Sequence, residues 1–337
     1  MTPITVGIPY RNEGQDFALL AGGLLEALRT LPRPLAAEVL ICVNGSGDGF
    51  AAHLADEAAA SGLGDYNVRV ISSAEGKLQA MRAIARSRAF HGYLAFVDSD
   101  VVLAPNVLRR LWEVLESDDR CMVSYGQPVP VFPYDGNAIH RLSRVHYALR
   151  DHAYQRPYFH GRAFMLRDWF LEEPSGLDGI AKDVVRRLTL EKGPVVDDVA
   201  MSLMAVARWG SASIREVPEA NVYFDPPDDL RGLYAGALRV AIELERLRLL
   251  YPQFATLQTR FLVKSWQRER LARFSWRVRS MHAVYRALDT TIQAGARLHA
   301  RCVRLGLLRV ESLWIRVPGT KRFDRHRRAW RVFRRRR

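Results

Sequence analysis

The sequence has few of the features that mark secreted or membrane-spanning proteins. Its cysteines are odd in number and far apart, which gives neither a disulfide framework nor a paired metal-ligand spacing: Cys42, Cys121 and Cys302. Nowhere do about 18 apolar residues run together, as a bilayer span requires. The opening residues, MTPITVGIPYRNEG, lack the basic region and apolar core of a secretory signal. We therefore expect a cytoplasmic protein that is neither secreted nor membrane-spanning.

Acidic residues are scarce in the last part of the chain. The 337 residues have a formal net charge of +14. Residues 1–260 carry 28 Lys and Arg against 32 Asp and Glu, whereas residues 261–337 carry 22 against 4. The basicity therefore belongs to the tail, and the pI of the whole chain says nothing about the substrate of the remainder.

Short apolar runs alternate with helical stretches in the first hundred residues. Buried strands are predicted at 4–9, 38–43, 68–71 and 93–97. Residues 15–31 and about 76–90 have the apolar spacing of helices. The pattern predicts an α/β fold with a mostly parallel, Rossmann-like sheet, whose ligands bind at the carboxyl ends of the strands.

The character of the chain changes after Pro226 and Pro227. Residues 230–250 have the pattern of one amphipathic helix, and strand signals nearly vanish after Pro252. We expect an α/β domain over residues 1–225, followed by a helical, Arg-rich region over residues 226–337.

Polar loops follow each of the four predicted strands. They are, in order, Pro9-Tyr10-Arg11-Asn12-Glu13-Gly14, Asn44-Gly45-Ser46-Gly47-Asp48-Gly49, Glu75-Gly76-Lys77 and Asp98-Ser99-Asp100. Lys77 opens a helix, where a diphosphate can bind the free N–H groups beside a positive charge. Asp98 and Asp100 cannot both be buried as anions without a cation, and Mg²⁺ or Mn²⁺ is suited to this role. An exposed polar turn that caps the next helix is the alternative.

Taken in this order, the four loops resemble those of the inverting nucleotide-sugar glycosyltransferases of family 2, which have the A-type glycosyltransferase fold. In that family a Pro-x-x-Asn-Glu loop and an Asp/Asn-Gly-Ser-x-Asp loop hold the nucleotide, a Gly-Lys helix follows, and an Asp-x-Asp ends the fourth strand. The resemblance covers residues 1–225. It implies a nucleoside-diphosphate sugar as donor and a divalent cation, Mn²⁺ or Mg²⁺, as cofactor.

The resemblance assigns roles to the matching positions. The residues implied in holding the nucleotide sugar are Pro9, Arg11, Glu13, Asn44, Lys77, Asp98 and Ser99. Asp98 would touch the ribose or the sugar, and Asp100, together with Asp98, would bind the metal that bridges the diphosphate. Asn44 stands where many relatives have an Asp that reads the base. Because an amide both donates and accepts hydrogen bonds, uridine and guanosine both stay open.

Two later segments resemble the acceptor side of the family. Gly161, between His160 and Arg162, would let the backbone approach the donor sugar; a plain turn with a solvated His and Arg is the alternative. Asp197 and Asp198 resemble the Glu/Asp-Asp motif, whose second acid takes the proton of the acceptor hydroxyl. We expect Asp198 to be the general base, with Asp197 raising its pKa or capping the following helix.

The sequence lacks the Gln-x-x-Arg-Trp motif of processive polysaccharide synthases in this family. We therefore expect transfer of one sugar, with inversion, to a hydroxyl of a lipid, a glycan, a protein or a small metabolite. The helix at 230–250 carries arginines that we expect to lie in water rather than over phosphates: Arg231, Arg239, Arg246 and Arg248. A nucleotidyltransferase is the alternative enzyme, but in that class the acid pair at 197–198 would have no role.

The basic tail contains two amphipathic stretches, at 257–288 and at about 297–305, with arginines between the apolar residues. Such helices suit an anionic membrane surface, and would place the protein peripherally on the inner face of the cytoplasmic membrane. Packing of their apolar faces on the catalytic domain or on another subunit is an equal alternative. Nucleic-acid binding would explain the tail but not the loops after the strands.

Overall fold

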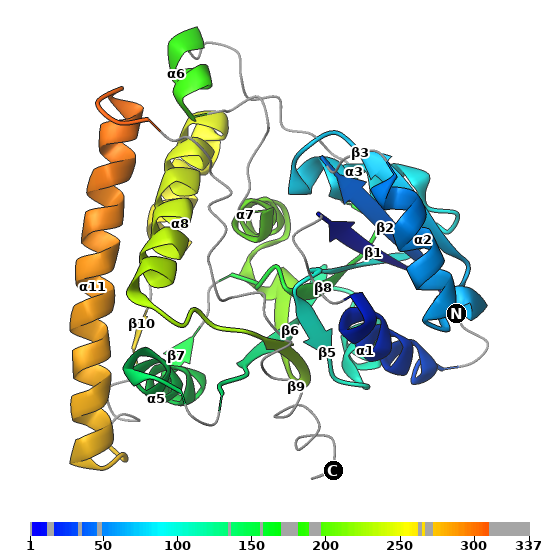
Figure 1. Ribbon diagram of the computed structural model, residues 1–337, viewed down its shortest axis with the longest axis horizontal. Helices are drawn as coiled ribbons and strands as arrows, with labels where there is room; N and C mark the ends of the chain where they lie inside the picture. The colour runs from blue at the N-terminus through cyan, green and yellow to red at the C-terminus, as the bar shows by residue number, and fades with distance from the viewer. Residues whose placement is uncertain are drawn as a thin grey trace. The chain divides into compact units, whose positions relative to one another are not determined.

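A computed structural model of the chain describes most of its residues. These are residues 2–11, 17–32, 36–45, 49–133, 136–155, 158–169, 181–188, 197–261, 265–266 and 272–309. They belong to two compact units (Figure 1). The first unit comprises residues 1–129, 158–174 and 192–224, and the second comprises residues 130–157, 175–191 and 225–337.

An eight-stranded sheet forms the centre of the first unit, in the order β3-β2-β1-β4-β8-β6-β9-β5. The strands are β1 (Ile4–Tyr10), β2 (Ala37–Asn44), β3 (Val68–Ser73), β4 (Tyr93–Val97), β5 (Val101–Leu103), β6 (Val123–Pro130), β8 (Ala163–Leu166) and β9 (Ile214–Phe224). Strands β1 to β4 are parallel, as predicted. In the other half, β8 runs antiparallel to β4 and β6, and β9 runs antiparallel to β5. The α/β fold is confirmed, and its sheet is mixed.

Helices surround this sheet. They are α1 (Phe17–Arg29), α2 (Phe50–Ala60), α3 (Lys77–Ser87), α4 (Val107–Ser117) and α7 (Asp197–Trp209), with short 3₁₀ helices η1 (Leu63–Tyr66) and η3 (Ser211–Ser213). Every residue of β1 and β4 is buried. A strand that is covered on both faces is apolar throughout, which is why these strands are readily predicted from sequence.

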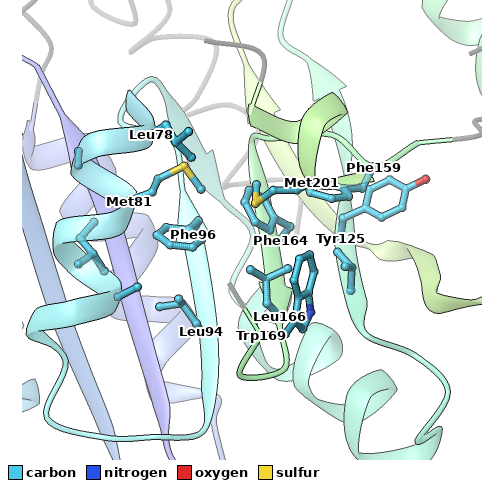
Figure 2. Close-up of a cluster of buried hydrophobic side chains, with 14 of the residues drawn as sticks. Leu78, Met81, Leu94, Phe96, Tyr125, Phe159, Phe164, Leu166, Trp169 and Met201 are labelled. Atoms are coloured by element: carbon cyan, nitrogen blue, oxygen red, sulfur yellow. The ribbon is translucent and has the colours of Figure 1, made fainter. Parts of the chain in front are cut away.

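A single apolar cluster holds α3 and α7 against one face of the sheet (Figure 2). Met81 comes from α3 and Met201 from α7, while β4 contributes Leu94 and Phe96. Alternate residues of a strand point to the same face, so Leu94 and Phe96 both face this cluster. The cluster thereby fixes the first turns of α3 and α7, which carry Lys77 and Asp198.

The second unit is mainly helical. Its elements are α5 (Ala138–Ala153), α6 (Lys182–Leu188), α8 (Leu230–Leu250), η4 (Pro252–Phe254), α9 (Ala255–Phe261) and α11 (Trp276–Arg304), with a two-stranded sheet of β7 (Tyr154–Gln155) and β10 (Ser265–Trp266). Helix α8 has the predicted bounds. It begins where the Gly232 amide donates to Asp229 Oδ1 at 2.6 Å, and it ends ahead of Pro252.

The long helix α11 lies alongside α8 and also packs on α5 (Figure 1). Helix α11 contains the end of the first amphipathic stretch expected in the tail, from residue 276 to 288, and most of the second. The first stretch is not one helix, because residues 257–261 belong to α9 and residues 265–266 to β10. No helix in the described part of the chain is long and apolar enough to cross a membrane.

The expectation that the α8 arginines lie in water is wrong for Arg246. Its side chain and that of Glu243 are both 0% exposed, and Arg246 Nη1 lies 2.5 Å from Glu243 Oε1. Arg231 and Arg248 are exposed, as expected, and Arg239 is half-buried. The spacing of three residues places Arg246 and Glu243 on the same face of the helix, where each neutralises the other's buried charge.

Candidate active site

The loops that follow the parallel strands meet at one edge of the sheet. Asn44, the last residue of β2, is 3% exposed, and its Nδ2 donates to the carbonyl oxygen of Tyr10 at the end of β1 (3.2 Å). Its Oδ1 is buried and accepts no hydrogen bond from the residues that the structure describes. This amide thus keeps an acceptor for another donor. Pro9 lies within β1, opposite Cys42, rather than in the loop after it.

A second contact joins the loop after β1 to the loop after β3. Arg11 Nη2 lies 3.1 Å from Glu75 Oε1, with both side chains about one-third exposed. Glu13 was predicted to hold the nucleotide alongside Arg11, and it lies outside the described residues.

Lys77 is the first residue of α3 and pairs with the acid at the end of β4. Its Nζ lies 2.7 Å from Asp98 Oδ1, and both side chains are largely buried. Gly76, ahead of Lys77, has a φ of +128°, a conformation that favours glycine. The Gly-Lys motif thus combines a sharp entry into the helix with a cation at its N-terminus.

Asp98, Ser99 and Asp100 form the turn between β4 and β5, and all three are half-buried. The Asp98 amide donates to the Arg162 carbonyl at 2.8 Å, which ties this turn to the start of β8. Among the described residues, no three His, Cys, Asp or Glu side chains come together as a metal site. Mg²⁺ or Mn²⁺ commonly takes one or two carboxylates and completes its shell with water and substrate phosphates. The oxygen donors of Asp98 and Asp100 fit such a shared ion.

Asp198 lies in the first turn of α7 and contacts the backbone before β8. Its Oδ2 accepts a hydrogen bond from the Gly161 amide at 3.1 Å, and its Oδ1 accepts one from the Val199 amide at 2.9 Å. A Cβ at position 161 would lie 3.1 Å from Asp198 Cβ, so glycine permits this close approach. Helix α7 begins at Asp197, whose side chain is outside the described part.

The surroundings of Asp198 favour its neutral form. Burial raises the pKa of its carboxyl group, and the negative charge of Asp98 adds to the increase. The Lys77 ammonium and the amides of Gly161 and Val199 oppose the shift without cancelling it. A carboxyl group whose pKa is raised is better suited to accept a proton.

His160 and Arg162 flank Gly161 and contact each other. Arg162 Nη1 lies 3.2 Å from His160 Nδ1, where a guanidinium N–H can donate to a neutral imidazole nitrogen. The Arg162 guanidinium also stacks on the Phe224 ring, 3.7 Å from its centroid. Neither side chain is simply solvated, as the plain-turn alternative would have it.

Two residues of this site were not predicted from the sequence. Ser202 is fully buried; its Oγ donates to the Asp198 carbonyl at 2.6 Å and accepts from the Phe159 amide at 3.2 Å. Its position four residues after Asp198 in a helix was the available signal. Phe224, which supports Arg162, had no comparable signal because it lies far away in the sequence.

Comparison with known proteins gives a family match and solved structures of similar fold. Residues 5–185 match the family described as glycosyl transferase family 2. No curated protein matches the sequence. A solved mannosyltransferase from Pyrobaculum calidifontis, in complex with GDP-Man and Mn²⁺, is similar in structure, with 16% identity, a TM-score of 0.51, and coverage of 90% of this chain and 88% of that one.

Glucosyl-3-phosphoglycerate synthase from Mycobacterium tuberculosis, solved with Mn²⁺, UDP-glucose and glycerol 3-phosphate, is 17% identical, with a TM-score of 0.45 and coverage of 73% of this chain and 80% of that one. At these identities the likeness to the mannosyltransferase shows the fold alone, which is the A-type glycosyltransferase fold predicted from the sequence. Because the family match spans more than half of the chain, the protein belongs to glycosyl transferase family 2 and is a glycosyltransferase.

Proposed function

We propose that the protein transfers one sugar from a nucleoside-diphosphate sugar to an acceptor hydroxyl, with inversion, and that Asp198 is the general base. Residues 1–225 would carry this activity. The position of Asp198 carries the proposal. Its Oδ2 accepts a hydrogen bond from the Gly161 amide at 3.1 Å, and its carboxyl group lies close enough to the Lys77–Asp98 pair for both charges to affect its pKa. Family membership speaks against the nucleotidyltransferase alternative.

The donor would bind at the carboxyl edge of the parallel strands. Lys77 offers a cation to the diphosphate, and the N-terminus of α3 offers backbone amides. The unsatisfied Oδ1 of Asn44 is an acceptor for an N–H group of the base. The two similar structures were solved with GDP-Man and with UDP-glucose, which supports a nucleoside-diphosphate sugar and leaves the base open. Asp98 and Ser99 would complete the donor site.

The transfer itself moves one proton and one sugar. The Asp198 carboxylate takes the proton of the acceptor hydroxyl, and the oxygen attacks the anomeric carbon of the donor. The bond from that carbon to the diphosphate oxygen breaks, and the electron pair leaves with the nucleoside diphosphate. Attack from the side opposite the leaving group inverts the configuration. Lys77 would stabilise the negative charge on the departing diphosphate.

Asp100 and Asp98 would hold the divalent cation. When bound, the ion supplies positive charge against the charge that builds on the leaving diphosphate. Both similar structures contain Mn²⁺. We propose Mn²⁺ or Mg²⁺ because both acids offer hard oxygen ligands and the remaining positions can be filled by phosphate.

His160, Gly161 and Arg162 would line the acceptor side. Gly161 keeps the space beside Asp198 free of a side chain, and Phe224 supports the guanidinium of Arg162. Because the sequence lacks the processive Gln-x-x-Arg-Trp motif, we propose that each acceptor receives a single sugar. We also propose that the protein is a peripheral membrane protein at the inner face of the cytoplasmic membrane.

A thermal-shift screen of UDP-, GDP- and dTDP-sugars, with and without Mn²⁺, tests the donor site. A bound donor raises the melting temperature in proportion to the logarithm of its concentration over Kd. One nucleotide class should stabilise the protein only when Mn²⁺ is present, and Asp100→Asn should abolish this metal dependence. Asp56→Asn, at an exposed position of α2, is the control and should behave as wild type. Full metal-dependent stabilisation of Asp100→Asn would contradict the assignment.

A further inference from the structure

Exposed large apolar side chains are concentrated on α11 and the turn after it. Eight such residues occur in the described part of the chain, and six of them lie between 276 and 308: Trp276, Val284, Leu298, Leu305, Leu307 and Leu308. Trp276 is 69% exposed and Leu298 is 65% exposed. Soluble proteins expose single apolar residues routinely, but a group of this kind on one element indicates an interaction surface.

The exposed apolar residues of α11 form a row along one face. At 3.6 residues per turn, Trp276, Val284, Leu298 and Leu305 fall within a sector of about 80°. The buried residues lie on the opposite side of the helix: His282, Tyr285, Ala296, Ala300 and Val303. The row therefore faces away from α8 and α5, against which α11 packs. We call it the outer row of α11.

Arginines accompany the outer row. Residues 272–309 contain eight arginines and a single acid, Asp289. By the same helical geometry, exposed Arg279, Arg297, Arg301 and Arg304 lie along one edge of the outer row, within about 100° of it. Arg304 also pairs with Glu245 of α8 at 2.8 Å. The face thus combines exposed apolar side chains with a strip of positive charge.

We propose that the outer row of α11 docks on the surface of a lipid bilayer that contains anionic lipids. The helix would lie in the plane of the surface, with its apolar side chains between the headgroups and its guanidinium groups on lipid phosphates. Trp276 suits this boundary because its ring is apolar and its N–H is polar. The docking is independent of the sugar-transfer chemistry proposed above.

Charge decides between the candidate occupants of this face. A second copy of the chain would bring a second set of arginines against the first, and like charges repel. The chain's own residues 310–337 carry 11 Lys and Arg against 2 acids, and would be repelled in the same way. A nucleic acid would satisfy the arginines, but it binds exposed aromatic rings by stacking, and five of the six exposed apolar residues are aliphatic. An anionic bilayer satisfies both the charge and the aliphatic side chains.

Vesicle co-sedimentation of the full chain tests the proposal. Wild type should bind vesicles of phosphatidylcholine mixed with phosphatidylglycerol, and should bind phosphatidylcholine alone much more weakly. The double variant Arg297→Gln and Arg301→Gln should bind about 25-fold more weakly, since each arginine at such a surface contributes about fivefold. The triple variant Trp276→Ser, Val284→Ser and Leu298→Ser keeps every charge and should lose at least about tenfold.

Matched controls change similar residues elsewhere. Leu230→Ser with Val240→Ser removes exposed apolar residues of α8, and Arg109→Gln with Arg110→Gln removes two exposed charges of α4. Both controls should bind vesicles as wild type does. All variants should keep the wild-type melting temperature, because the changed side chains are exposed.

Three results would overturn the proposal. One is wild-type vesicle binding by the triple variant, which would assign the binding to another part of the basic tail. The second is that wild type fails to bind anionic vesicles but self-associates in sedimentation equilibrium, and that the triple variant no longer self-associates. The third is binding of RNA or DNA, but not of anionic vesicles, by wild type.

Discussion

Gly161→Ala tests how closely the base must be held. The new Cβ would lie 3.1 Å from Asp198 Cβ and 3.4 Å from its Oδ2, so the Asp198 side chain must shift by a few tenths of an ångström. That shift would weaken the hydrogen bond from the Gly161 amide. A hydrogen bond to a charged group contributes about 1.5–3 kcal/mol. If the proposed transfer depends on this geometry, turnover should fall by about ten- to a hundredfold.

The assay is release of nucleoside diphosphate from whichever donor stabilises the protein, measured against pH. Because the Gly161 amide lowers the pKa of Asp198, its loss should also move the acid limb of the rate profile to higher pH. Donor binding, measured by thermal shift, should be the same as in wild type. Gly64→Ala is the control, since no atom lies within 4 Å of a Cβ at that position. Wild-type turnover and an unmoved acid limb in Gly161→Ala would refute the reasoning.

Three further predictions concern charge. Lys77→Met should move the acid limb of the pH–rate profile to higher pH, because the Lys77 ammonium lowers the pKa of Asp198. Lys77→Arg keeps the charge and should largely preserve the wild-type profile. An unmoved acid limb in Lys77→Met would contradict the prediction. Burial raises the pKa of folded Asp198, so the unfolded chain loses this proton first as pH rises. The free energy of unfolding of wild type should then fall relative to that of Asp198→Asn as the pH rises above the ordinary aspartate range. If urea unfolding gives the same pH dependence of this free energy for both proteins, the prediction is wrong. Arg246→Met should lower the free energy of unfolding in urea by about 3–5 kcal/mol, because it removes one partner of a buried ion pair. Arg246→Met with Glu243→Leu should cost far less, and equal losses would count against a buried pair.

The parallel half of the sheet could be predicted because its strands are buried on both faces and therefore apolar throughout. β1 and β4 are fully buried over their whole lengths, and the polar motif after each marks where it ends. The bounds of α8 could be predicted for a similar reason. Asp229 caps one end and Pro252 follows the other, so local chemistry sets both limits.

The antiparallel half could not be predicted in the same way. β8 lies between β4 and β6, and β9 pairs with β5, which comes more than a hundred residues earlier. Pairings of this kind depend on how the whole sheet closes rather than on a local pattern. The support that Phe224 gives to Arg162 depends on one of these strands, so it was equally hidden.

The basic tail shows a different limit of prediction from the sequence. Its spacing of apolar residues indicated amphipathic helices, but spacing alone does not say which side packs inward. In α11, Tyr285 is buried whereas Val284, its neighbour, is 57% exposed. The pairing of Arg246 with a buried acid likewise required the packed structure.

The central claim is that Asp198 acts as the general base of the sugar transfer and takes no part in binding the donor. The most direct measurement compares Asp198→Asn with wild type in two readouts taken on the same preparation. Stabilisation by the nucleotide sugar with Mn²⁺ should be retained, and nucleoside-diphosphate release should fall by about 10²–10⁴-fold. Release at the wild-type rate would contradict the account, and so would loss of donor binding.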